Sequence, residues 1–147
     1  MLEANWNTGT SYTTNVGLVS QGLTYTFKIR SANSVGYSLE STTISIKAAQ
    51  VPDRPDPAPT TLMVNSDIRI SWLAPNNRGQ TITAYIVKIR TGDGVSFQAD
   101  ASCDGSLSTV VSDLSCKVPI SVLRAQPYSL AWGQTVVATV IAVNSYG

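Results

Sequence analysis

The sequence contains no histidine and only nine acidic residues among 147. Histidine is the commonest metal ligand and the usual acid–base group near neutral pH, so its absence removes most hydrolase triads and imidazole metal sites. There is also no Gly-x-Ser-x-Gly motif, no phosphate-binding glycine loop and no carboxylate pair typical of glycosidases. We therefore expect a protein that is not an enzyme and that uses no cofactor and no metal.

Charge of either sign is also scarce, because charged residues make up 13% of the chain and the formal net charge is +1. Nucleic-acid and membrane-surface partners need a basic patch, and the basic residues here are scattered along the sequence. No apolar run approaches the roughly 18–20 residues of a membrane-spanning helix. We expect no nucleic-acid partner and no direct membrane insertion of this segment.

Cysteine occurs twice, at Cys103 and Cys116, with positions 104 to 115 between them. An even number of cysteines without histidine or Cys-x-x-Cys argues against a zinc or thioredoxin-type site. The pair can form a disulfide that clamps an excursion between two strands, or can remain as two buried thiols. We favour the disulfide, which would add about 3 kcal/mol of stability. It indicates an oxidising compartment, and hence an extracellular or cell-surface protein of the secretory pathway.

What the chain has in abundance is alternation of apolar and polar residues with a period of two, rich in Thr, Val and Ile. This pattern is typical of strands with one buried face, and no segment shows convincing helical periodicity. We predict an all-β fold with these strands: 10–16, 24–32, 41–48, 58–64, 67–73, 81–91, 95–100, 116–121 and 135–144.

One pattern also repeats at long range: Gly22, Asn33 and Gly36 recur with the same spacing as Gly133, Asn144 and Gly147. The offset of 111 residues (144 − 33) exceeds the roughly 20–50 residues of solenoid repeats and suits one β-sandwich plus a linker. We therefore predict a tandem array. Its expected parts are the C-terminal part of one domain at 1–48, a Pro-rich linker at 49–56, and a second domain lacking its final strand at 57–147.

Several motifs resemble fibronectin type III domains when they are taken in order. Tyr25-x-Phe-x-Ile-x-Ser-x-Asn33-x-x-Gly36 resembles strand F and the turn after it, Ser-Trp72-x-x-Pro75 resembles strand B, and Tyr85 falls at the strand C tyrosine. The resemblance implies tandem immunoglobulin-like sandwiches. The residues expected to form their core signature are Trp72, Tyr85, Tyr25, Asn33, Gly36, Asn144 and Gly147.

An immunoglobulin domain is the nearest alternative and fits less well, and the chain also departs from the fibronectin type III pattern in two places. An immunoglobulin domain would carry cysteines in strands B and F and its tryptophan in strand C, whereas here Trp72 lies in B and the cysteines lie elsewhere. Val136 replaces the tyrosine that Tyr25 supplies in the first copy. The cysteine-containing segment, with Trp132 expected to cap the sandwich end, resembles a variant in large repetitive surface proteins of ciliate-like protists.

These observations predict a non-enzymatic structural or interaction segment of a large extracellular or cell-surface tandem-repeat protein. One form of this prediction is that the whole protein assembles into filaments. The expected partners are neighbouring repeats of the same or another chain, through strand complementation. One alternative is an adhesin or receptor ectodomain that binds protein or glycan through the loops at 76–79 and 33–36. A second alternative is an accessory region of a secreted enzyme. Asp53 and Asp56 offer too few oxygen ligands for calcium.

Overall fold

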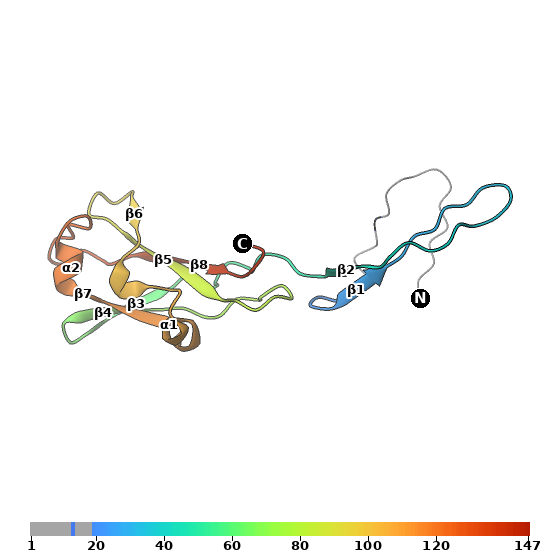
Figure 1. Ribbon diagram of the computed structural model, residues 1–147. Helices are drawn as coiled ribbons and strands as arrows, with labels where there is room; N and C mark the ends of the chain where they lie inside the picture. Colours follow the sequence, from blue (N-terminus) through green and yellow to red (C-terminus); the bar gives the residue numbers. More distant parts are fainter. Residues whose placement is uncertain (1–12, 14–18) are drawn as a thin grey trace. The chain divides into compact units, whose positions relative to one another are not determined.

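Figure 1 shows the computed structural model, which describes residue 13 and residues 19–147. The chain divides into two units, Met1–Ala48 and Ala49–Gly147. Every pair of neighbouring strands is antiparallel, so the fold is all-β as predicted. The strand predicted at 10–16 lies, except for Thr13, outside the described residues.

The described part of unit 1 is one long hairpin. Strand β1 (Thr24–Phe27) pairs with β2 (Ile44–Lys47), with Thr24 opposite Lys47 and Phe27 opposite Ile44. Both strands are shorter than predicted, and the chain between them is held by individual backbone hydrogen bonds. No residue from 19 to 48 is buried, so this hairpin contributes no core of its own among the described residues.

Unit 2 contains two three-stranded antiparallel sheets. One sheet has the order β3 (Thr60–Val64), β4 (Asp67–Ser71), β7 (Ser115–Pro119), and the other β6 (Phe97–Gln98), β5 (Ala84–Arg90), β8 (Ala138–Val143). The alternating residues of β4, β5, β7 and β8 that point inward form one apolar cluster between the sheets. Each of these four strands buries one face and exposes the other, and in β4, β5 and β7 this alternation appears in the sequence as a period of two.

Two short helices contradict the expectation of a chain without helices. Helix α1 (Ser108–Asp113) lies inside the segment bounded by the cysteines, and α2 (Ile120–Arg124) follows β7 directly (Figure 1). The predicted strand 116–121 therefore ends at Pro119, where proline stands at the N-cap of α2. Neither helix is long enough to display an apolar stripe of period 3.6, and isolated helices of this length are unstable, so packing must stabilise them.

Residues 49–56, predicted to form a linker, are fastened to unit 2 along much of their length. The N–H of Gln50 donates to the carbonyl of Arg78 at 3.0 Å, and the N–H of Asp53 donates to the carbonyl of Asn76 at 2.9 Å. Pro55 is buried. These contacts make the proline-rich segment part of the second sandwich rather than a free spacer.

A search of the described residues for a helix long and apolar enough to cross a bilayer finds none.

Candidate functional site

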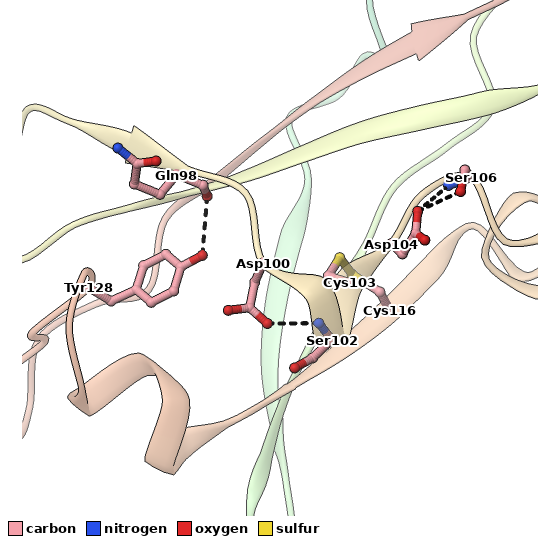
Figure 2. Close-up of a disulfide and its surroundings, with 8 residues drawn as sticks. All are labelled: Gln98, Asp100, Ser102, Cys103, Asp104, Ser106, Cys116 and Tyr128. Atoms are coloured by element: carbon pink, nitrogen blue, oxygen red, sulfur yellow. Dashed lines mark hydrogen bonds between the residues drawn. A yellow bond between two sulfur atoms is a disulfide. The ribbon is translucent and has the colours of Figure 1, made fainter.

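The disulfide predicted between Cys103 and Cys116 is present (Figure 2). Cys103 ends a 3-10 turn at Ala101–Cys103, and Cys116 lies in β7 opposite Ile70 of β4. The Cα atoms are 5.2 Å apart, within the normal range for a disulfide, and both side chains are buried. The bond therefore holds both ends of the segment 103–116, which contains α1, at the core.

The polar groups around the disulfide serve the local turns (Figure 2). The carboxylate of Asp100 accepts from the N–H of Ser102 at 2.8 Å and caps the 3-10 turn. The carboxylate of Asp104 accepts from the hydroxyl and the N–H of Ser106 at 2.7 and 2.9 Å, and these hydrogen bonds lower the pKa of Asp104. Asp93, in the turn between β5 and β6, likewise accepts from the N–H groups of Val95 and Ser96, each at 2.9 Å. These hydrogen bonds give the carboxylates a structural role in the local turns.

Tyr128 packs on the same end of the sandwich and is almost completely buried. Its hydroxyl donates to the carbonyl of Gln98 at 3.4 Å (Figure 2). Burial, followed by the nearby charge of Asp100, raises the pKa of Tyr128 to about 12. A phenol held neutral in this way is a core residue. In the described part of the chain, no three His, Cys, Asp or Glu side chains come together in a group that could hold a metal ion.

Trp72 and Tyr85 lie together in the core of unit 2. Their ring centroids are 5.1 Å apart with an interplanar angle of 58°, and both side chains are buried. Burial raises the pKa of Tyr85. The indole N–H of Trp72 is buried and has no hydrogen-bond partner among the described atoms. Packing between the sheets therefore accounts for both residues.

The two repeated Gly–Asn–Gly motifs adopt the same backbone turn. Gly22 and Gly133 have φ angles of 83° and 79°, which are left-handed conformations that favour glycine. In each copy the N–H of the asparagine donates to the carbonyl of the second glycine, at 3.0 Å for Asn33 and 3.1 Å for Asn144. The side-chain oxygen of each asparagine also accepts backbone N–H groups of its own turn. The sequence repeat is thus a repeat of local structure.

Tyr25 and Asn144 show what distinguishes the two copies. The hydroxyl of Tyr25 accepts from the N–H of Ser20 at 2.7 Å, whereas Val136 in the second copy packs against the core. Asn33 is exposed, but Asn144 is 4% exposed. The amide of Asn144 donates to the carbonyl of Gln50 at 2.8 Å, with longer contacts to the carbonyls of Asn77 and Gln80. In unit 2 the turn asparagine therefore fastens the entering chain to β8.

Trp132 does not cap the sandwich end, contrary to expectation. Its side chain is 79% exposed, and the guanidinium of Arg124 lies over the indole ring at 3.9 Å from its centroid. The buried position at this end is taken by Tyr128, together with Leu123 and Leu130. Periodicity could not reveal this, because these residues lie in α2 and the irregular chain after it.

Two glycines, Gly105 and Gly92, allow close backbone approaches. Tyr85 donates its N–H to the carbonyl of Gly105 at 2.9 Å, and a Cβ atom on Gly105 would overlap the carbonyl group of Tyr85. Gly92 approaches the chain at Tyr128 and Ser129 in the same way. The pattern at 91–94 predicts a hairpin turn around Gly92, but nothing in the sequence predicts either close approach.

No protein-family model matches the chain. It is 27% identical over 136 residues to a Kelch domain-containing protein of Saccharolobus solfataricus, a match that covers 92% of this chain and 18% of that protein. The chain thus spans less than a fifth of the length of this relative. Kelch propellers consist of four-stranded blades, whereas the sheets described here have two or three strands, so that name is not carried over to this chain.

Proposed function

We propose that this chain is a non-enzymatic structural segment of an extracellular or cell-surface protein built from tandem fibronectin type III-like sandwiches. The observation that carries the proposal is the repeated Gly–Asn–Gly turn, which has matching backbone geometry in the two units at an offset of 111 residues (144 − 33). Equal turns in successive units favour an array in which one type of domain is used again.

The strand order of unit 2 supports the same proposal. In fibronectin type III terms, β3, β4 and β7 correspond to strands A, B and E, and β6, β5 and β8 to C′, C and F. Trp72 beside β4 and Tyr85 in β5 occupy the core positions that this correspondence implies. The buried disulfide favours an oxidising compartment.

Immunogold electron microscopy of native cells tests the location and role together. Antibodies raised against unit 2 should label the cell surface or extracellular material. Mass spectrometry of native protein, alkylated before reduction, should recover Cys103 and Cys116 as a linked pair. Cytoplasmic labelling together with free thiols would contradict the proposal.

A further inference from the structure

The outer face of the β5–β8 pair is apolar over two successive residue pairs. Ile86 lies directly opposite Ile141, and the next pair along the strands is Ala84 and Val143. These side chains alternate with the buried residues of both strands and so point away from the core. Ile86 is 43% exposed and Ile141 is 51% exposed. The solvated face of an antiparallel sheet is ordinarily polar, so these isoleucines need a reason other than the core.

A polar version of the same strand is present in unit 1. At the repeat offset of 111 residues (144 − 33), Ile141 corresponds to Arg30 and Thr139 corresponds to Lys28. Arg30 and Lys28 are exposed, and the ammonium of Lys28 lies 2.9 Å from the carboxylate of Glu40. The strand therefore forms without an apolar outer face, and the apolar face is a property of unit 2.

This face is distinct from the edge of β8. A strand placed beside β8 would pair with it through backbone hydrogen bonds and extend the sheet in its own plane. The outward side chains of Ile86 and Ile141 would remain uncovered. Covering them takes a second layer, and the element that ordinarily lies flat on a sheet is another sheet, about 10 Å away. An apolar face bordered by polar residues, here the pair Lys88 and Thr139, marks an interaction surface.

The distribution of charge makes this face complementary to itself. Its cations, Lys88 and Arg90, both belong to β5, whereas the residues of β8 on the same face are uncharged. A two-fold axis parallel to the strands lays β5 of each copy over β8 of the other. Ile86 of one copy then faces Ile141 of the second copy, Lys88 faces Thr139, and no cation meets a cation.

The other two-fold arrangement fits less well. An axis perpendicular to the strands lays β5 over β5, and Lys88 then lies against Ala84 of the second copy when the two Ile86 side chains meet. Placing an ammonium against apolar surface is unfavourable because the charge loses water without gaining a partner. The arrangement with β5 over β8 is therefore preferred.

We propose that the outer face of the β5–β8 pair binds the same face of a second copy of this chain, about a two-fold axis parallel to the strands. The proposal rests on the structural role proposed above and names a lateral contact for it. Since the equivalent strand of unit 1 is polar, the contact belongs to unit 2 and would fix the stagger between two neighbouring chains.

Disulfide trapping in the full 147-residue chain tests this contact, because both natural cysteines are already joined to each other. Lys88→Cys and Thr139→Cys are made in separate chains, which leaves the isoleucines in place, and the two variants are mixed under mild oxidation. Proximity should make the mixed 88–139 disulfide form at least about ten times faster than either same-site disulfide. Mass spectrometry distinguishes the three products.

The matched control pairs Thr139→Cys with Leu62→Cys. Leu62 points outward from the other sheet and is 66% exposed, so its cysteine is at least as accessible but lies outside the proposed contact. This pair should cross-link at the slow rate of random collision. A mixed 88–139 product no faster than the 62–139 product would overturn the proposal. A dominant 88–88 product would also overturn it, because it would show β5 lying over β5.

A second pair of variants tests whether the isoleucines hold the copies together. Ile141→Arg, which installs the residue that unit 1 carries at this position, should slow the 88–139 cross-link at least about tenfold by placing a charge in the apolar contact. Ile141→Val keeps the face apolar and should change the rate little. Equal rates for the two variants would reject this contact. None of these outcomes affects the labelling and thiol measurements, so the failure of this contact is distinguishable from the failure of the proposed function.

Discussion

Gly105 is the residue whose replacement we expect to be most damaging. A Cβ atom there would lie 2.6 Å from the carbonyl carbon of Tyr85 and closer still to its oxygen. The carbonyl carbon and oxygen belong to the backbone and cannot rotate away. Gly105→Ala should therefore lower the free energy of unfolding of unit 2 by about 3 kcal/mol or more, the upper end of the range for overpacked substitutions. Urea unfolding of unit 2 measures the loss.

Gly94 provides the control for this substitution. It has a φ of +77° and no atom within 4 Å of a built Cβ, so Gly94→Ala should cost only about 1–2 kcal/mol from backbone strain. Equal losses for the two variants would show that the contact with Tyr85 is relieved by a small shift of the chain.

Asp93 should give the stability a pH dependence. Hydrogen bonds from Ser96 and Thr91, and from the N–H groups of Val95 and Ser96, hold the pKa of Asp93 well below its usual range. The stabilisation is therefore fully present above the unfolded pKa of about 3.9 and is lost as the pH falls through the lower folded value.

Asp93→Asn should therefore lower the urea midpoint at pH 7, and its difference from wild type should shrink below about pH 4. Thr91→Val removes one donor and should reduce the same dependence. A difference that stays constant from pH 7 to pH 2.5 would refute this account.

At the scale of the element, the turn after β8 holds the entering chain in place. Asn144→Ala leaves the carbonyls of Gln50, Asn77 and Gln80 without this donor in a largely buried position. We expect the free energy of unfolding of unit 2 to fall by about 2 kcal/mol. Asn33→Ala alters the equivalent turn in an exposed setting and should leave the stability of unit 2 unchanged.

Helix α1 should depend on the disulfide for its stability. It spans six residues between Cys103 and Cys116 and is too short to persist alone. Reduction should cost about 3 kcal/mol and should accelerate amide exchange in α1 more than in β4 and β5. Hydrogen exchange with mass spectrometry, before and after reduction, measures the loss of global stability and the change in amide exchange in α1, β4 and β5. Equal acceleration in all elements would indicate that the bond acts only through global stability.

The elements also show why some were predictable. Strands β4, β5 and β7 alternate between the core and solvent, so their residues carry the period of two in the sequence itself. Helix α2, by contrast, begins where Pro119 ends β7, and its Leu123 is buried in the core cluster. Segments far apart in the chain form that core, so the sequence of α2 shows no periodic pattern that would predict it.

At the scale of the whole molecule, the two units should differ sharply in protection. The buried core lies in unit 2, and residues 19–48 contribute no buried side chain. Amides of β1 and β2 should therefore exchange orders of magnitude faster than those of β4, β5 and β8 in the dilute full-length chain. Protection of β1 and β2 that matches the protection of β5 would contradict this expectation.

The sequence by itself determined the all-β class, the disulfide pair and the repeated turn. These features depend on local alternation, on the presence of two cysteines, and on glycine and asparagine at fixed spacing. The tertiary structure alone decided the two helices, the exposure of Trp132, the burial of Tyr128 and the attachment of residues 49–56 to unit 2. The physical reason is that these outcomes depend on which surfaces meet after the sheets pack, and such contacts join residues far apart in the chain.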